Sequence, residues 1–224
     1  MRPIIKVCGM RDMENIREVE ALGIDLMGFI FWPHSSRYVA ERPAYLPTHC
    51  KRVGVFVDED IETVKRIADD YSLDYIQLHG HESPDYIRAL NVQWSMFRSS
   101  SARLLPKGRK NVQCSIIKAF NIATTEDFLQ TVPYASLADY FLFDTKGKSV
   151  GGNGEKFDWS VLSAYDGDTP FLLSGGIGPD DAERVKAFHH PKCIGIDLNS
   201  RFELAPGLKD VAALRKFLNE INRK

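Results

Sequence analysis

The sequence has little cysteine and no excess of charge of either sign. Its four cysteines are scattered over 224 residues without a Cys-x-x-Cys pair, which excludes a disulfide-stapled scaffold and favours a reducing compartment. The 29 basic and 30 acidic residues leave a net charge of −1, which argues against nucleic-acid or anionic-membrane partners. No apolar stretch approaches the roughly 18 residues of a membrane span. These absences predict a soluble, cytoplasmic protein.

Short apolar, strand-forming runs recur along the chain at regular intervals. Several are apolar at consecutive positions, which is typical of strands buried on both faces of a sheet. The eight expected strands are Ile4–Cys8, Leu26–Phe31, Arg52–Val57, Asp74–His79, Ser115–Phe120, Asp139–Asp144, Pro170–Ser174 and Cys193–Leu198. The segments with helical periodicity are Asp12–Leu22, Glu59–Tyr71, Ser83–Leu90, Thr125–Leu137, Asp180–Phe188 and Leu208–Ile221.

This alternation predicts an α/β fold, in which residues 1–224 form a single (β/α)8 barrel domain. Each strand–helix unit would average about 28 residues, at the lean end of barrel sizes. The alternative, an open doubly wound sheet, normally uses about five or six strands. One unit is long, and its residues 91–113 include two basic clusters. We interpret residues 91–113 as a polar, basic surface excursion rather than a nucleic-acid patch.

In such a barrel, functional groups gather where the strands end and the next loops begin. Gly175 and Gly176 follow the seventh expected strand, and Asn199 and Ser200 follow the eighth. Glycines let backbone N–H groups approach an anion closely, and barrels often hold a phosphate between these two loops. The alternative is that the glycines only make a tight turn. We predict a phosphate site here.

Cys8 and Asp144 end the first and sixth strands and are a candidate acid–base pair. A thiolate is a competent base where positive charge lowers its pKa, and Lys6 points the same way as Cys8 by the period of two. A carboxylic acid can donate a proton where burial raises its pKa. The alternatives are that Cys8 is only a small buried side chain and that Asp144 caps the next helix.

Arg37 and His79 complete the candidate set. Arg37 could clamp a substrate carboxylate with two parallel hydrogen bonds, or it could be a surface residue. His79 could shuttle protons, or it could be a hydrogen-bonded structural residue. His79 and His81 resemble a metal-ligand pair, but the fifth and sixth strands supply no further histidine, so we predict no metal. Gly147-Lys148-Ser149 lacks the first glycine of a P-loop.

The strand ends also form a set of short motifs in a fixed order. The motifs are Lys6-Val-Cys8-Gly9-Met10, Phe31 with Ser36-Arg37-Tyr38-Val39, Val53–Val57, Gln77-Leu-His79-Gly80, Phe143-Asp144-Thr145, Gly151–Gly154 with Phe157-Asp-Trp159, and Ser174–Ile177. Together they resemble the phosphoribosylanthranilate isomerases, a family of tryptophan-pathway enzymes, over nearly the whole chain. The resemblance implies a cofactor-free Amadori rearrangement of N-(5-phosphoribosyl)anthranilate to 1-(2-carboxyphenylamino)-1-deoxyribulose 5-phosphate.

The resemblance also implies roles for the candidate residues. Cys8 would be the general base, Asp144 the general acid, and Arg37 would hold the anthranilate carboxylate. The phosphate ligands would be Gly175, Gly176, Asp197, Asn199 and Ser200. We also expect His79 to line the substrate site. The implied partner is a small phosphosugar, with no cofactor or metal, and the oligomeric state stays open between monomer and homodimer.

Two stretches of the chain depart from the family pattern. Arg201 replaces a glycine in the loop after the eighth strand, and Asn153 replaces a threonine. Two other interpretations of the chain stay open. One is a different phosphosugar barrel enzyme, such as an epimerase or a lyase. The other is a non-catalytic barrel that binds a phosphate-bearing ligand while Cys8 and Asp144 are only structural.

Overall fold

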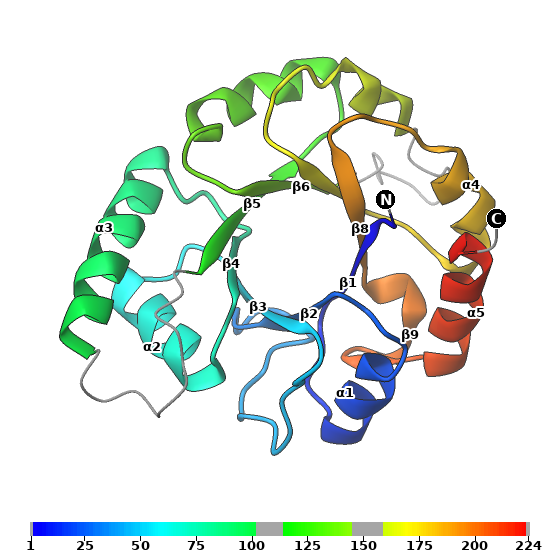
Figure 1. Ribbon diagram of the computed structural model, residues 1–224, viewed down its shortest axis with the longest axis horizontal. Coiled ribbons are helices and arrows are strands. Elements are labelled where there is room, and N and C mark those ends of the chain that lie inside the picture. The colour runs from blue at the N-terminus through cyan, green and yellow to red at the C-terminus, as the bar shows by residue number, and fades with distance from the viewer. Residues whose placement is uncertain (1, 102–113, 145–158, 223–224) are drawn as a thin grey trace.

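Eight parallel strands close into a barrel in the computed structural model, which describes residues 2–101, 114–144 and 159–222. The strands are β1 Ile4–Val7, β2 Leu26–Ile30, β3 Lys51–Phe56, β4 Tyr75–Leu78, β5 Ser115–Asn121, β6 Tyr140–Asp144, β7 Phe171–Ser174 and β8 Cys193–Leu198. Each strand pairs with the next, and β8 pairs with β1, so the ring is complete (Figure 1). The predicted barrel is confirmed, and every expected strand agrees with the structure to within one residue at either end.

Helices surround the ring of strands (Figure 1). The α-helices are α1 Met13–Glu20, α2 Ile61–Tyr71, α3 Pro84–Ser101, α4 Ala182–Ala187 and α5 Val211–Asn222. The 3-10 helices are η1 Thr125–Tyr134, η2 Trp159–Ala164, η3 Pro179–Asp181 and η4 Ser200–Phe202. Asp12 and Asp60 begin α1 and α2, because each carboxylate accepts a hydrogen bond from a backbone N–H of the first turn. None of the described helices is long and apolar enough to cross a membrane.

Three expectations about the helices were wrong in part. The segment from Thr125 forms a 3-10 helix, in which Pro133 lacks the N–H that a continuing α-helix needs. Leu208–Lys209 forms a short strand, β10, which pairs with β9 (Glu203–Ala205), so α5 begins only at Val211. Helix α3 continues to Ser101, so residues 91–101 are not a surface loop. Residues 102–113 lie outside the described part of the chain.

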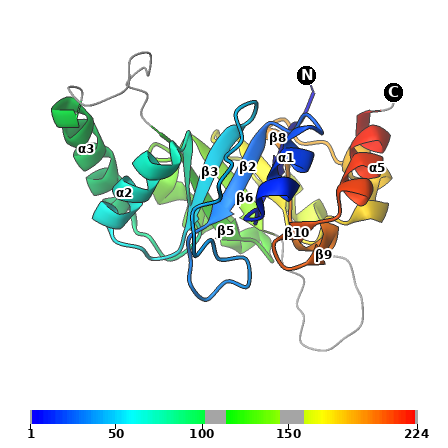
Figure 2. The ribbon, with the colours of Figure 1, turned by 90° about the horizontal axis from the view of Figure 1, so that it is seen from below.

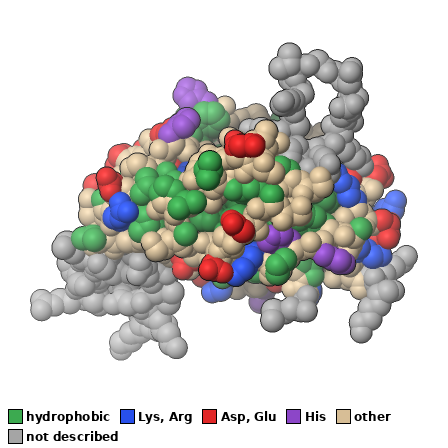
Figure 3. Space-filling model, turned by 90° about the horizontal axis from the view of Figure 1, so that it is seen from above, with side chains coloured by type: hydrophobic (Ala, Val, Ile, Leu, Met, Phe, Trp, Pro, Cys, Tyr) green, Lys and Arg blue, Asp and Glu red, His purple; other side chains and the backbone are tan. Residues whose placement is uncertain are grey.

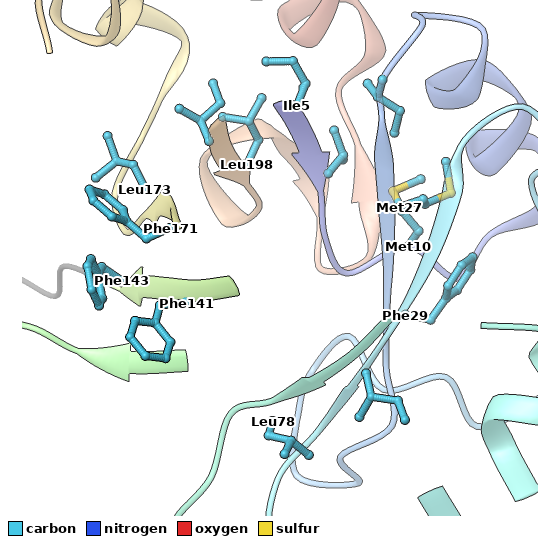
Figure 4. Packing of buried hydrophobic residues seen from close by; sticks show 14 of the residues in the cluster. Ile5, Met10, Met27, Phe29, Leu78, Phe141, Phe143, Phe171, Leu173 and Leu198 are labelled. Carbon is cyan, nitrogen blue, oxygen red and sulfur yellow. The ribbon is translucent and has the colours of Figure 1, made fainter. Parts of the chain in front are cut away.

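The strands bury both of their faces, in two separate layers. Inside the barrel lies a small apolar cluster: Leu26, Val53, Ile117, Ala119, Leu142 and Leu172. A larger layer between the strands and the helices includes Phe141, Phe143 and Phe171 (Figure 4). Alternate residues of a strand face opposite sides, so Phe141 and Phe143 point outward where Leu142 points inward. The same period turns Lys6 of β1 into the barrel interior.

The loop after β2 and the β9–β10 hairpin extend from the same end of the barrel (Figure 2). This is the end at which all eight parallel strands finish. The segment 31–50, which joins β2 to β3, contains no helix, so the barrel mouth is covered there by a loop. On another side of the molecule, apolar side chains are exposed over the 3-10 segments (Figure 3), and Leu129 and Val132 of η1 are among the exposed apolar residues.

Candidate active site

A cavity of about 670 Å³ opens at the carboxyl ends of the strands. Its walls include all nine residues that the sequence put forward: Cys8, Arg37, His79, Asp144, Gly175, Gly176, Asp197, Asn199 and Ser200. Residues as far apart in the sequence as Cys8 and Ser200 therefore lie around one space. The structure brings together the candidate acid, the candidate base, the candidate carboxylate clamp and the candidate phosphate loops.

Cys8 lies directly after β1, with its thiol packed against β2. Its backbone N–H donates to the carbonyl of Leu198 at 2.9 Å, which extends the pairing of β1 with β8. A Cβ atom on Gly28 would lie 2.6 Å from the Sγ atom of Cys8, so only glycine leaves room for the thiol. Gly9 follows with a positive φ of 81°, a conformation that glycine adopts without strain.

Lys6 and Asp197 form a buried ion pair beside Cys8. The Nζ atom of Lys6 donates to Oδ1 of Asp197 at 2.8 Å, and Ser174 donates to Oδ2 at 3.3 Å. Burial raises the pKa of the Cys8 thiol, and the positive charge of Lys6 opposes this without overcoming it. Burial therefore favours the neutral thiol over the thiolate. The two carboxylate oxygens of Asp197 thus accept from Lys6 and Ser174.

His79 and Asp144 approach each other from the ends of β4 and β6. The Nε2 atom of His79 lies 3.6 Å from Oδ2 of Asp144, and Nδ1 lies 3.1 Å from the amide nitrogen of Gln77. The side chain of His81 is exposed and contacts Asp58, so the two histidines do not share a site. In the described residues, no group of three His, Cys, Asp or Glu side chains could hold a metal ion.

Arg37 is held by Glu203, which is held in turn by Lys209, and neither was among the predicted site residues. Glu203 accepts from Nε of Arg37 at 2.8 Å and from Nη2 at 2.5 Å. Lys209 donates to the same carboxylate at 2.6 Å. Burial raises the pKa of Glu203, but hydrogen bonds from Arg37 and Lys209 outweigh it and hold that pKa below its usual range. With Nε and Nη2 engaged on one edge, the guanidinium can still offer its other edge to a ligand.

A weak signal for Glu203 was present in the sequence. The family pattern after the eighth strand ends in a glutamate, and Glu203 occupies that position. Its partner Arg37 is 166 positions away, however, and no local pattern connects the two residues. Lys209 lies in a two-residue strand, which is too short to show a period of two.

The loops after β7 and β8 face each other across one wall of the cavity. Gly175 and Gly176 both have positive φ angles, which glycine adopts without strain. The side-chain oxygen of Asn199 accepts from Lys209 at 2.8 Å. The Nε atom of Arg201 donates to the carbonyl of Gly176 at 3.3 Å, so Arg201 joins the two loops and lines the cavity.

Comparison with known proteins identifies the family. The family model described as N-(5'phosphoribosyl)anthranilate (PRA) isomerase matches residues 5–104 and 106–220. The chain belongs to the PRA isomerase family. Because that match spans both the strands and the loops of the barrel mouth, membership in the PRA isomerase family covers the whole candidate site.

Two relatives and one solved structure illustrate this PRA isomerase membership. The chain is 47% identical to an N-(5'-phosphoribosyl)anthranilate isomerase of Parabacteroides distasonis over 224 residues, which cover 97% of this chain and 93% of the relative. It is 46% identical to that of Phocaeicola vulgatus, with 99% and 98% covered. A phosphoribosyl anthranilate isomerase in complex with reduced 1-(o-carboxyphenylamino)-1-deoxyribulose 5-phosphate superposes with a TM-score of 0.75 at 25% identity, covering 98% of each chain.

Proposed function

We propose that this protein isomerises N-(5'-phosphoribosyl)anthranilate to 1-(2-carboxyphenylamino)-1-deoxyribulose 5-phosphate, a cytoplasmic step of tryptophan biosynthesis. The proposal rests on the cavity at the barrel mouth, where Cys8, Asp144, Arg37 and the loop of Gly175 and Gly176 lie together. The chain also belongs to the PRA isomerase family. The reaction moves protons and electron pairs within one molecule. An acid, a base and two anion-binding groups are therefore a sufficient set of parts.

The phosphate and the carboxylate of the substrate would fix its orientation. The phosphate fits the loops after β7 and β8, where a Cβ atom on Gly176 would meet no described atom within 4 Å and the backbone is open to a ligand. The carboxylate fits the edge of the Arg37 guanidinium that Glu203 leaves available. With the substrate held by these groups, the ribose would lie between Cys8 and Asp144, which line the same cavity.

Asp144 would act first, as the general acid. It donates a proton to the ring oxygen while the bond between that oxygen and C1 breaks. The nitrogen lone pair of the anthranilate forms the new C=N bond, which gives a ring-opened iminium cation. Asp144 is left as a carboxylate beside Nε2 of His79, whose partial positive charge can stabilise it.

Cys8 would act second, as the general base. The iminium cation acidifies the hydrogen on C2 and also places a positive charge near the thiol, which favours the thiolate that burial disfavours. Cys8 reacts as the thiolate, after its own proton has passed to solvent on substrate binding. It takes the C2 proton, the C–H electrons form a C1=C2 bond, and the C=N electrons return to nitrogen. A proton added at C1 and one lost from the C2 hydroxyl then give the ketone and restore both side chains.

Lys6 and Asp197 would act through Cys8. The buried ammonium of Lys6 is the positive charge that supports a thiolate at Cys8, and Asp197 holds that ammonium in place at 2.8 Å. We therefore propose that Asp197 positions the base and does not bind phosphate itself. The oligomeric state in which this happens is a separate question, open between monomer and homodimer.

The direct test is to add the protein to freshly formed phosphoribosylanthranilate and to separate the products by liquid chromatography. We expect conversion to the deoxyribulose phosphate. A different phosphosugar product would point to an epimerase or a lyase. Binding of the substrate without any turnover would support the non-catalytic barrel, in which Cys8 and Asp144 are only structural.

A further inference from the structure

Gln77 is a buried amide that the proposed reaction does not use. It lies on β4, where its neighbours in the sheet register are Val55 and Ile117, and its side chain lines the cavity at 1% exposure. Its Oε1 atom is buried and has no hydrogen-bond partner among the residues that the structure describes. A buried acceptor without a partner destabilises a fold compared with an apolar side chain of the same shape. We therefore infer that the amide is present at position 77 because its nitrogen donates a hydrogen bond.

The amide nitrogen of Gln77 faces His79. Nε2 of Gln77 lies 3.1 Å from Nδ1 of His79, and an amide nitrogen can only donate. Nδ1 must then be the lone-pair nitrogen, and the proton of a neutral His79 must sit on Nε2. Adding a second proton at Nδ1 would set two donors against each other, so this contact also opposes the formation of an imidazolium.

The state of His79 matters for the group on its other side. Its Nε2 atom lies 3.6 Å from Oδ2 of Asp144. A full positive charge at this distance would hold Asp144 as a carboxylate before the reaction, and no proton would be left for ring opening. A neutral ring with an N–H on Nε2 adds no such charge, yet it can stabilise the carboxylate that forms once the proton has left.

We propose that Gln77 is a positioning residue, which keeps His79 neutral and protonated on Nε2 so that Asp144 retains its proton until ring opening. The proposal rests on the general-acid role proposed for Asp144. It requires no contact between Gln77 and the substrate.

Other charged groups surround His79. Lys118 of β5 donates to the carbonyl of Gly80 at 2.7 Å and pairs with Glu82 at 3.0 Å. Asp58 pairs with His81. The remaining titratable or charged side chains on the described walls of the cavity are Cys8, Arg37, Asp197 and Arg201.

The substitution Gln77→Glu tests the proposal because it changes one atom group and keeps the shape. A carboxylate would accept from a protonated Nδ1 and so stabilise the imidazolium that the amide opposes. We expect nitrogen NMR to show that His79 takes its second proton at least about one pH unit higher, a tenfold change in that equilibrium. Because Asp144 must be protonated to work, the alkaline limb of kcat should move to lower pH, with KM changed less than about threefold.

The sign of that movement separates the proposal from a simple charge effect. A new carboxylate acting directly on Asp144 would help it to hold its proton and would move the alkaline limb to higher pH. The same substitution in a His79→Asn background should therefore lose the downward movement. Gln93→Glu on α3 is the matched charge control and should leave the pH profile unchanged.

The NMR measurement on the unsubstituted protein does not depend on whether the protein turns over its substrate. We expect the neutral ring of His79 to carry its proton on Nε2 and not on Nδ1, as the contact with Gln77 requires. A proton on Nδ1, or an imidazolium at neutral pH, would overturn the proposal. A protein that shows the expected His79 but fails to turn over phosphoribosylanthranilate would overturn the proposed function instead. If Gln77→Glu does not fold, Gln77→Met should free His79, which would then populate both neutral forms; an unchanged ring would contradict the proposal.

Discussion

Glu203 joins two cations, Arg37 on one side and Lys209 on the other. The three side chains are only 20%, 5% and 0% exposed for Arg37, Glu203 and Lys209, so solvent does little to screen them. The pKa of Glu203 is lowered in the folded protein, so its contribution to stability is complete above its unfolded pKa, near about 4.3. That contribution is lost as the pH falls through the folded pKa.

Glu203→Gln should therefore destabilise the protein in a pH-dependent way. Removing one partner of a buried ion pair typically costs about 3–5 kcal/mol, because the other charges stay buried without compensation. We expect a loss of this size in the free energy of unfolding by urea at pH 7, and a smaller difference from the unsubstituted protein below about pH 4. A difference that stays constant from pH 7 to pH 3 would contradict the role of the carboxylate charge.

Cys8→Ala and Asp144→Asn should each stop turnover while the ligand still binds. General acid or base assistance is typically worth about 10²–10⁴-fold, so each variant should lower kcat by at least about a hundredfold. The dissociation constant of a reduced product analogue should change no more than a few-fold, because the glycine loop and Arg37 remain. Cys8→Ser should behave like Cys8→Ala, since a hydroxyl is a far weaker base. A Cys8→Ala enzyme that keeps more than a tenth of kcat would refute the assignment.

Arg201 should contribute to phosphate binding. Its Nε atom donates a hydrogen bond to the carbonyl of Gly176, so the guanidinium group lies beside the loops after β7 and β8. A hydrogen bond to a charged group is worth roughly 1.5–3 kcal/mol, so Arg201→Gly should raise KM at least several-fold with little change in kcat. Arg201→Lys is the control that keeps the charge and should recover part of the loss. An unchanged KM in Arg201→Gly would mean that Arg201 does not reach the phosphate.

At the scale of elements, the loop between β4 and α3 depends on the buried ion pair of Glu82 with Lys118. Glu82 receives hydrogen bonds from Lys118 at 3.0 Å and from the backbone N–H groups of Asp58 and Gly80, each at 3.0 Å. This carboxylate therefore fastens β5 and the loop after β3 to the loop that follows His79. The arrangement fixes the backbone at Gly80, the residue that follows His79.

Glu82→Gln should loosen that loop and lower stability together. The loss of the buried negative charge leaves Lys118 uncompensated, and we expect about 3–5 kcal/mol less free energy of unfolding. Combining Glu82→Leu with Lys118→Met should recover only part of this, because two backbone N–H groups would still lack their acceptor. The measurement is urea unfolding of the three proteins; full recovery in the double variant would show that the backbone contacts contribute nothing.

At the scale of the whole molecule, the ring of strands was predictable from the sequence. Strands of a parallel barrel are buried on both faces, so they read as short apolar runs such as Leu26–Ile30 and Phe171–Ser174. Fold rules then place the functional groups at the ends of those runs, which is how Cys8 and Asp144 could be assigned to one mouth.

The remaining features could not be predicted because they depend on contacts between distant residues or on very short elements. Glu203 and Lys209 lie in a hairpin whose strands are three and two residues long. The bond from Gln77 to His79 depends on side-chain directions that no periodicity encodes. The predicted helix was shorter than α3 because residues 91–113 are polar and the whole range was interpreted as one surface loop.

The pairing of β1 with β8 also determines when this protein can become active during its synthesis. Lys6 and Asp197 are 191 positions apart, so at about 5–20 residues per second a ribosome releases β1 some 10–40 s before it completes β8. Throughout that interval β1 has an unpaired edge that another nascent chain could join. The last strand then covers that edge and supplies the partner of Lys6 in one event. The protection of this edge and the completion of the ion pair beside Cys8 therefore occur together, when β8 is in place.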